Sequence, residues 1–498
     1  MFENISTIRE LLFTISEQYG ERPLFSYMED GKARSVSYAR FAGQVNAAAK
    51  SLIQRGITGR HVSIVSENSY EALMWAYAVP LAGNVLIMLD NMATLQEKAH
   101  LAAHSDTTCL IYSKSNQPFR DYLEQSNQQV RDTICIDTDT EEYLNTASDA
   151  SLPDTDGREM AYIFYSSGTT SRPKGIMQSQ INLLRSALYF TRSADLKDTV
   201  YLMLPISHIL TFANVALASM LSGASVFIST GLKHIWTDMR EAKPYCIFAV
   251  PAVMAFFDRT IQAAAQDIHR ADPAIDSLSA RKTALGSLFG ENLAHFTIGG
   301  APINLDVANH LQELGVQVLN GYGLTETCGS ITVNPRHDNR LGSIGRVNAG
   351  SDVKVMDGEL AFKNPYLFLG YYKDEEATGQ AFEGEWFLSG DLGHVEDGYV
   401  YITGRKKNLI VLPNGKKICP EELEQEALGI EEIKEVVICE QDGRLTAKIY
   451  SEHDEDVIRR KINELNKRLS SYKQIANIIF YAEEFPKTSS KKIKRGEI

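Results

Sequence analysis

Short apolar runs alternate with longer amphipathic stretches along the chain up to about residue 330. Each run is short enough for a buried strand, and the stretch after it is long enough for a helix. The predicted strands are Val62–Ser66, Thr108–Tyr112, Thr133–Ile136, Ala161–Phe164, Cys246–Val250, Phe296–Ile298 and Val316–Asn320. Strands that alternate with helices pair in parallel, so this rhythm predicts parallel sheets covered by helices.

Two longer apolar runs, residues 72–89 and 210–228, are long enough to suggest a membrane span. The first is interrupted by Pro80 and Gly83, and the second by Gly223. We therefore predict a buried helix, a turn at the glycine and a strand in each. Helix–glycine–strand is the repeating unit of a doubly wound sheet, so no transmembrane segment is expected.

The pattern changes after residue 340, where short strands and Asp-Gly turns predict a small antiparallel sheet or barrel. Farther along, Glu435–Glu440 and Leu445–Ser451 predict a pair of strands. The expected fold is therefore α/β. Residues 1–405 would form a large domain of two doubly wound sheets plus the small antiparallel sheet, and residues 406–498 a small, mobile α+β domain.

Composition argues against a nucleic-acid-binding, zinc-binding or secreted protein. A chain of 498 residues is too long for one hydrophobic core, and its net charge of −13 argues against nucleic acid as the main partner. The six cysteines form no CxxC pair, which predicts free thiols in a reducing compartment rather than structural zinc. The N-terminal residues show no signal-peptide pattern, so we expect a cytoplasmic protein.

The most informative segment is YSSGTTSRPKG, residues 165–175. It follows a predicted strand and precedes a predicted helix near Ile181. Hydroxyls and backbone N–H groups can donate to phosphate oxygens, glycine permits close approach, and lysine neutralises charge. Glycine rather than Ser or Thr follows the lysine, so this is not a Walker A loop. The alternative is a flexible surface loop. The candidate phosphate ligands are Ser166, Ser167, Gly168, Thr169, Thr170 and Lys174.

The motif NGYGLTE carries a second group of candidates. Gly321 and Gly323 bracket Tyr322, whose flat ring can stack on a purine. Thr325 can donate a hydrogen bond to a phosphate or carboxylate oxygen. Glu326 offers the hard oxygen ligand that Mg²⁺ prefers. The alternative is a glycine-rich strand end.

Two further turns add nucleotide contacts. Gly300, Ala301 and Pro302 follow a predicted strand and can form a backbone shelf for the edge of adenine, although small residues and proline also suit any tight turn. Asp391 stands in SGD, after the predicted strand end at Trp386–Leu388. Its carboxylate can accept hydrogen bonds from two ribose hydroxyls.

Taken in their order along the chain, the motifs resemble those of the acyl-adenylating superfamily. This superfamily holds acyl-CoA synthetases, adenylation domains of peptide synthetases and luciferases. The resemblance covers the whole chain. It implies that His208 in LPISH borders the acyl carboxylate, and that Asp391 and Arg405 contact the ribose and phosphates. It also implies that Lys492 in PKTSSKKIKR bridges the acyl carboxylate and the α-phosphate, and that Lys407 is a hinge between two domain arrangements.

Four residues depart from the family pattern. Ser171 replaces a glycine of the phosphate loop, Gln180 replaces a common histidine, Val411 stands where many members carry lysine, and Lys491 replaces the glycine before the catalytic lysine. The departures at Ser171 and Lys491 leave open a degenerate, ATP-binding scaffold. Pyrophosphate release without coenzyme A would exclude that alternative.

The activity implied by the resemblance is that of an acyl-CoA synthetase, closest to the fatty-acid branch. It would use ATP and Mg²⁺ to form an acyl-AMP and then transfer the acyl group to coenzyme A. Ile209, Leu210 and Asn214 would line the pocket for the acid. The alternatives are an acyl-AMP ligase that loads the pantetheine of an acyl carrier protein, and an aryl-acid CoA ligase.

Overall fold

The computed structural model describes residues 2–126, 129–146, 149–166, 173–412, 416–487 and 493–498. Its described residues form two compact units. The first holds the residues up to 351 together with 364–380, and the second holds residues 352–363 and 381–498. The second compact unit thus includes the antiparallel strands before Arg405 as well as the C-terminal residues. The predicted domain boundary at residue 405 is the point about which the C-terminal domain would move, and it stays a prediction.

The first unit contains a nine-stranded sheet whose central strands run parallel. In spatial order its strands are β15 (Arg346–Val347), β14 (Gly329–Val333), β13 (Gln317–Leu324), β12 (His295–Ile298), β11 (Cys246–Ala249), β9 (Thr199–Leu202), β10 (Ser225–Ile228), β1 (Pro23–Glu29) and β2 (Lys32–Ser37).

A seven-stranded sheet completes the first unit, again with a parallel centre. In spatial order its strands are β18 (Gly370–Tyr371), β8 (Gly175–Ser179), β7 (Met160–Tyr165), β4 (Val85–Met88), β3 (His61–Val65), β5 (Cys109–Tyr112) and β6 (Asp132–Cys135). The order jumps along the chain because helices cross over between parallel strands.

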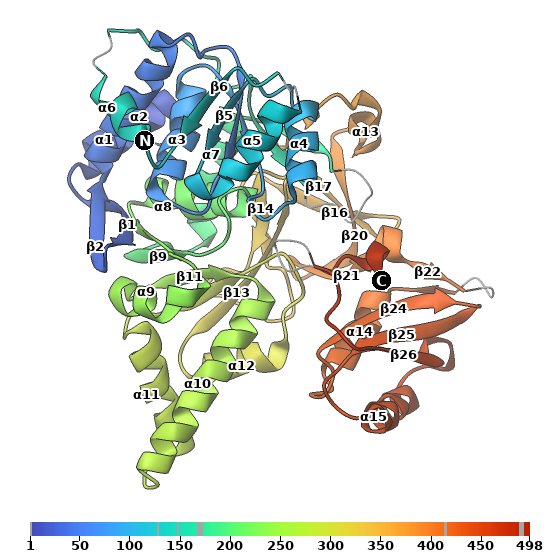
Figure 1. Cartoon of the computed structure of the whole chain (residues 1–498). Helices are drawn as coiled ribbons and strands as arrows, with labels where there is room; N and C mark the ends of the chain where they lie inside the picture. The colour runs from blue at the N-terminus through green and yellow to red at the C-terminus, as the bar shows by residue number, and fades with distance from the viewer. Residues whose placement is uncertain (1, 127–128, 147–148, 167–172, 413–415, 488–492) are drawn as a thin grey trace. The chain divides into compact units, whose positions relative to one another are not determined.

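Helices cover both large sheets, as Figure 1 shows. In chain order they are α1 (Ile8–Tyr19), α2 (Tyr38–Gln54), α3 (Tyr70–Leu81), α4 (Leu95–His104), α5 (Gln117–Gln125), α6 (Thr140–Asn145), α7 (Gln180–Ser193), the π-helical segment η3 (Leu210–Leu217), α8 (Ala218–Ser222), α9 (Ile235–Ala242), α10 (Pro251–Ala271), α11 (Ser277–Phe289), α12 (Leu305–Glu313) and α13 (Glu375–Gln380).

Successive side chains of the central strands enter different hydrophobic cores. Val200 of β9 lies in a core that joins both large sheets through α2, α3, α7 and η3, whereas Tyr201 lies in a second core under α9 to α12. Side chains alternate across a strand, so a strand covered on both faces is apolar at every position. This explains the continuous apolar runs of the sequence and confirms the doubly wound interpretation.

The two long apolar runs fold as predicted. Residues 70–88 form α3 and β4, and Gly83 between them has a φ of 76°. Residues 210–228 form η3, α8 and β10, with Gly223 at a φ of 75°. A residue with a side chain is strained at such angles, so glycine ends each helix. No helix in the described parts of the chain is long and apolar enough to cross a membrane.

The second unit is built on antiparallel strands, as the Asp-Gly turns predicted. Its five-stranded sheet pairs β16 (Asp352–Met356), β17 (Glu359–Lys363), β20 (Trp386–Glu396), β19 (Phe382–Glu383) and β21 (Tyr399–Arg405). The two turns, Asp357-Gly358 and Asp397-Gly398, hold all four of these residues at positive φ. Such turns match the twist of paired strands, so they favour hairpins.

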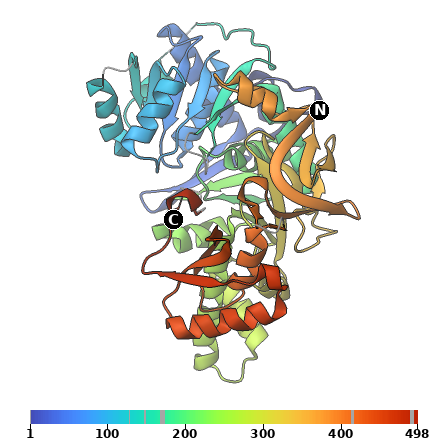
Figure 2. The same ribbon diagram turned by 90° about the vertical axis from the view of Figure 1, so that its right-hand side faces the viewer.

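The C-terminal residues add two small sheets and two helices to this unit. The elements are β22 (Ile410–Val411), β23 (Lys417–Ile418), α14 (Pro420–Leu428), β24 (Glu435–Gln441), β25 (Arg444–Tyr450), α15 (Glu455–Arg468) and β26 (Asn477–Tyr481). The predicted strand pair is confirmed as β24 and β25, which run antiparallel. Helix α15 packs its apolar face into the same core as these strands (Figure 2).

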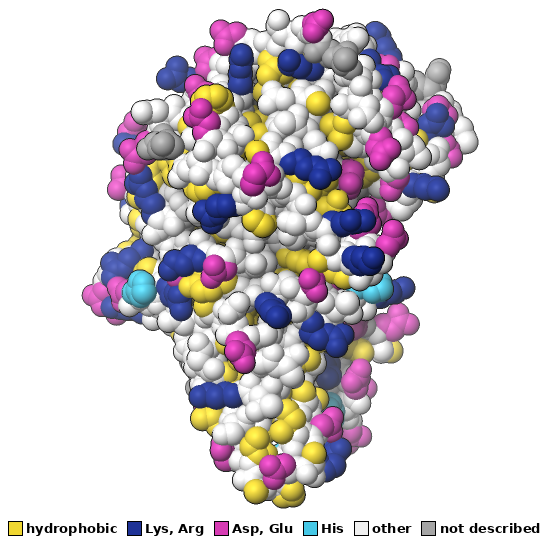
Figure 3. All heavy atoms as spheres, turned by 90° about the vertical axis from the view of Figure 1, so that its left-hand side faces the viewer, with side chains coloured by type: hydrophobic (Ala, Val, Ile, Leu, Met, Phe, Trp, Pro, Cys, Tyr) yellow, Lys and Arg dark blue, Asp and Glu magenta, His cyan; other side chains and the backbone are white. Residues whose placement is uncertain are grey.

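Surface charge is mixed on the face drawn in Figure 3, where basic and acidic side chains lie interspersed. No extended field of one sign develops over the described residues of that face. All six cysteines, each within the described residues, are free thiols, four of them buried.

Candidate active site

The phosphate-loop segment joins two strands of the seven-stranded sheet. Tyr165 at the end of β7 pairs with Gly175 at the start of β8, and the Ser166 N–H donates to the carbonyl of Lys174 at 3.3 Å. The helix predicted near Ile181 is confirmed as α7, which begins at Gln180. Strand β8, between the loop and this helix, was not predicted from the sequence. Four of the six predicted ligands lie outside the described residues: Ser167, Gly168, Thr169 and Thr170.

The NGYGLTE motif is the end of a strand and the turn after it. Gly321, Tyr322 and Gly323 lie in β13, which pairs antiparallel with β14. Thr325 and Glu326 lie in the connecting turn. A Cβ at residue 323 would stand only 1.9 Å from a backbone oxygen of β14, so only glycine allows this pairing.

Three motifs meet beside Gly299, which follows β12. A Cβ added there would lie 3.4 Å from the Gly321 carbonyl oxygen and 3.9 Å from Cδ2 of Leu210. Strands β12 and β13 are parallel neighbours, and η3 follows β9 in the same sheet. Ligands of open α/β sheets bind outside the carboxyl ends of the strands, which is where the shelf, the NGYGLTE motif and the predicted acid pocket converge.

The predicted metal ligand and the phosphate-loop lysine share one neighbour, Tyr371. Its hydroxyl donates to Oε1 of Glu326 at 2.9 Å, and Nζ of Lys174 lies 4.4 Å from the centre of its ring. Burial, and then the adjacent Glu326 carboxylate, raise the pKa of Tyr371 well above its usual range, so the hydroxyl keeps its proton. The sequence analysis missed this residue because no local spacing relates it to either motif.

A second missed residue, Gln178 of β8, holds the backbone of the same turn. Its Nε2 donates to the Thr325 carbonyl at 2.7 Å, and its Oε1 accepts from the Cys328 thiol at 2.7 Å. Gln178 is fully buried, and buried polar groups that are all paired fix one local geometry. The sheet that carries the phosphate loop therefore also fixes the Thr325 turn.

The predicted acid-pocket residues lie at the start of η3, a π-helical segment of the kind often found at functional sites. His208, Ile209 and Leu210 directly precede or begin it, and Ile209 is buried. Asn214 is fully buried, and its Oδ1 accepts from the Ser330 N–H at 2.9 Å. Its Nδ2 has no hydrogen-bond partner among the described residues, so this amide retains a donor for a ligand.

The two predicted ribose contacts pair with each other in the second unit. Asp391 of β20 lies opposite Arg405 of β21, and Nε of Arg405 lies 3.0 Å from Oδ1 of Asp391. The SGD segment was predicted to follow a strand end, and this was wrong: β20 continues through it to Glu396. Gly390, at a φ of 73°, permits the irregular pairing with β17 that keeps the strand intact.

The predicted hinge and catalytic lysine are only partly described. Lys407 is exposed in the 3₁₀ turn Lys406–Asn408, directly after β21. Although the residue is exposed overall, partial desolvation of its amine, followed by repulsion from Arg405, lowers the pKa of Lys407. Lys492 and Lys491 lie outside the described residues, while Lys487 and Ile493 form an antiparallel bridge. The roles of these lysines stay predictions.

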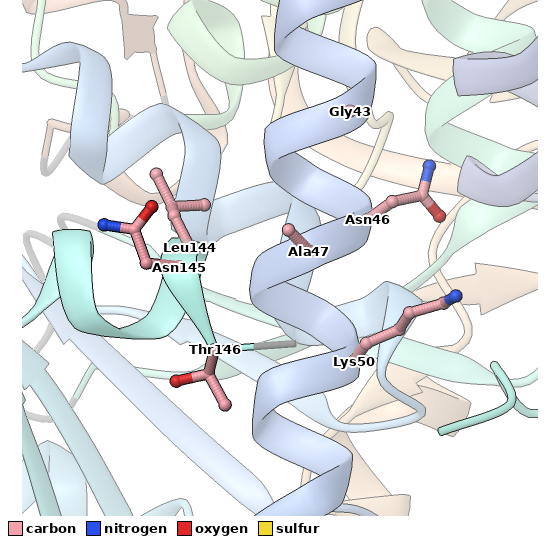
Figure 4. A pocket seen from close by; sticks show the side chains of 7 residues that line it. All are labelled: Gly43, Asn46, Ala47, Lys50, Leu144, Asn145 and Thr146. Atoms are coloured by element: carbon pink, nitrogen blue, oxygen red, sulfur yellow. The ribbon is translucent and has the colours of Figure 1, made fainter. Parts of the chain in front are cut away.

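The described residues also contain a hollow away from these motifs. A hollow of about 380 Å³ lies between α2 and α6, but Asn46 and Lys50 point away from α6 in Figure 4. It is lined by Gly43, Asn46, Ala47, Lys50, Leu144, Asn145 and Thr146. Within the described residues, no group of three or more His, Cys, Asp or Glu side chains could hold a metal. Mg²⁺ needs only one or two carboxylates when phosphates supply the other ligands, so Glu326 still fits.

Comparison with known proteins confirms the family resemblance. A family model described as AMP-binding enzyme matches residues 12–372. The long-chain-fatty-acid–CoA ligase FadD15 of Mycobacterium bovis is 28% identical over 469 residues, 83% of this chain and 77% of the relative. The 2-succinylbenzoate–CoA ligase of Listeria innocua is 25% identical over 473 residues, 91% of this chain and 92% of the relative.

One solved structure matches nearly the whole chain. It is the o-succinylbenzoate CoA synthetase of Bacillus subtilis in complex with its acyl-adenylate intermediate, with a TM-score of 0.81 and 21% identity. The match covers 98% of this chain and 97% of the other. This likeness confirms the predicted fold class.

Proposed function

Because the chain belongs to the AMP-binding enzyme family, we propose that it is an AMP-forming acid–thiol ligase that acts on an apolar carboxylic acid. In the first step the carboxylate attacks the α-phosphorus of ATP, forms the acyl-AMP and releases pyrophosphate. In the second step the thiol of coenzyme A attacks the acyl carbonyl and AMP leaves. ATP and Mg²⁺ are the cofactors, and coenzyme A is the acceptor.

The convergence beside Gly299 carries this proposal. The carbonyl of Gly321, just before Tyr322, and the Leu210 side chain at the start of η3 both lie within van der Waals distance of a Cβ placed at Gly299. Absence of a side chain at Gly299 would let a flat base or an acyl-phosphate approach the backbone at the end of β12. Nearby, Lys174 and Glu326 supply the positive charge and the carboxylate that a metal–polyphosphate requires.

The chemistry needs positioning and charge compensation more than covalent catalysis. Lys174 and the hydroxyls of the phosphate loop would bind the β- and γ-phosphates, and Thr325 would donate to the α-phosphate or the acid. Glu326 would hold Mg²⁺, which neutralises charge on the phosphate oxygens when it is bound. Lys492 would stabilise the charge that develops at the α-phosphate.

Apolar surroundings favour an acid without an α-ammonium group. Amino-acid-activating relatives usually have an aspartate at the position after His208, and here that residue is the buried Ile209. Phe212 and Ala213 beside it are fully buried and apolar. An unpaired ammonium in such a site would cost several kcal/mol. A fatty acid therefore fits best, and the Nδ2 donor of Asn214 could bind one polar group of the acid.

Pyrophosphate release across a panel of fatty, aryl and free α-amino acids tests the proposal. We expect release with ATP, Mg²⁺ and a fatty acid in the absence of coenzyme A, followed by thioester formation when coenzyme A is added. Preferential activation of an α-amino acid would refute the assignment of the acid. Thioester formation with carrier-protein pantetheine but not with coenzyme A would refute the assignment of the acceptor.

A further inference from the structure

The side chain of Tyr371 contacts two motifs that lie far apart in sequence, one through its hydroxyl and the other through its ring. The carboxylate of Glu326 accepts from the hydroxyl, and the ammonium of Lys174 lies over the ring face. Glu326 is 45 residues away along the chain and belongs to the turn after β13 of the other large sheet. All three residues lie within the first compact unit.

Accordingly, we propose that Tyr371 is a positioning residue that couples the phosphate-loop lysine to the carboxylate that would hold Mg²⁺. The proposal rests on the ATP-dependent function proposed above. It assigns to Tyr371 no contact with the substrate: the tyrosine acts through Glu326 on the metal and through Lys174 on the polyphosphate.

The backbone around Tyr371 is held from both sides, so its hydroxyl has little freedom to move. Tyr371 pairs with Ile176 in the ladder between β18 and β8. On the other side, the Phe368 N–H donates to the Glu326 carbonyl at 2.9 Å, and the rings of Phe368 and Tyr371 are 4.9 Å apart. Tyr371 is 9% exposed. A change in its side chain should therefore affect the two contacts without displacing the strand.

The two contacts have separate consequences. A metal-binding carboxylate has several oxygen lone pairs and rotates freely unless another group orients it, and the Tyr371 hydroxyl orients Glu326. An ammonium over a ring face is attracted less strongly than in a buried ion pair. Lys174 is therefore held near the phosphate loop but can exchange to phosphate oxygens.

The variant Tyr371→Phe separates these contacts, because it keeps the ring for Lys174 and removes only the hydroxyl that orients Glu326. The next residue supplies a matched control. The Tyr372 hydroxyl donates to Oδ2 of Asp106 at 2.7 Å, so Tyr372→Phe removes a tyrosine–carboxylate hydrogen bond that involves neither Glu326 nor Lys174. Both variants leave the Gln178 hydrogen bond that holds the Thr325 turn.

Two measurements follow, one of binding and one of rate. The first titrates Mg²⁺ against the thermal shift that ATP produces, with no acid present. The second titrates Mg²⁺ in the pyrophosphate-release assay. Loss of a group that orients a metal ligand typically weakens metal binding about 10- to 100-fold. We expect the Mg²⁺ concentration for half-maximal response to rise about tenfold or more in Tyr371→Phe, and the rate to recover at saturating Mg²⁺. Tyr372→Phe should match the wild type in both titrations.

The proposal is overturned if the two variants show the same Mg²⁺ dependence. It is also overturned if Tyr371→Phe lowers thermal stability, acid affinity and rate together with no recovery at high Mg²⁺, since that pattern indicates only a structural role. Absence of pyrophosphate release by the wild type would instead refute the proposed function, while the binding titration would still report on Tyr371.

Discussion

The substitution Gly299→Ala tests most directly whether the end of β12 is a nucleotide shelf. The added methyl would lie 3.4 Å from the Gly321 carbonyl oxygen and 3.9 Å from the Leu210 side chain. These are ordinary van der Waals distances, and the backbone of Gly299 is not in the left-handed region. The fold itself should therefore accept the methyl.

The expected effect of the methyl on the free energy of unfolding differs enough from its effect on the free energy of ligand binding for the two to be distinguished. A Gly→Ala change at a compatible backbone position alters the free energy of unfolding by less than about 1 kcal/mol. A methyl inserted into a closely packed contact with a ligand costs about 1–3 kcal/mol. At 1.4 kcal/mol for each factor of ten, the second range corresponds to roughly a 5- to 140-fold loss in kcat/KM for adenylation.

Pyrophosphate release at varied ATP and acid concentrations measures the binding effect, and thermal denaturation measures the folding effect. Gly286→Ala, within α11, is the control, because nothing lies within 4 Å of the added methyl. It should stabilise the protein by about 0.5–1 kcal/mol and leave kcat/KM unchanged. Gly300→Ala differs from both, because Gly300 has a φ of 86°, at which an alanine would strain the fold itself.

An unchanged kcat/KM in Gly299→Ala, with an unchanged melting temperature, would refute the shelf. It would mean that neither the nucleotide nor the acid approaches the backbone between the ends of β12 and β13. A loss of melting temperature as large as that of Gly300→Ala would instead show that the added methyl disturbs the fold.

Three further predictions concern the lysines of the C-terminal part and one buried histidine. Lys492→Ala should slow acyl-AMP formation about 10²–10³-fold or more, yet spare thioester formation from supplied acyl-AMP; the same loss in Lys491→Ala instead would show that the wrong lysine is assigned. Lys407→Pro fixes φ at the proposed hinge, so acyl-AMP formation should survive while thioester formation falls by orders of magnitude. Equal losses in both half-reactions would remove Lys407 as the hinge. Burial lowers the pKa of His295 to about 4, whereas an unfolded histidine has a pKa of about 6.5. Because the unfolded state gains the proton first, the stability of the fold falls as the pH drops from the higher to the lower of these values. His295→Gln should have a shallower fall in melting temperature over that range, and an identical slope would contradict the assignment.

The sequence alone was sufficient to predict the α/β fold class, whereas the roles of the motif residues stay predictions. The apolar runs that became β3, β5, β7 and β12 were visible because strands buried on both faces are apolar throughout. Gly83 and Gly223 marked their turns because few other residues adopt a positive φ without strain. The convergence of motifs at the strand ends fits such a sheet, whose ligands bind outside the carboxyl ends, but it became visible only in the structure.

Contacts between distant segments depended on the tertiary structure. Tyr371 reaches Glu326 and Lys174 only because β18 pairs with β8 in one particular register, and a shift of one residue would turn its side chain to the other face of the sheet. Asp391 faces Arg405 only because β20 continues past the SGD segment instead of ending there. Local patterns reveal which residues are suited to a ligand, because propensity and spacing act over a few positions. Which of those residues hold one another in place is decided by strand register and packing across the sheet, and these depend on segments far along the chain.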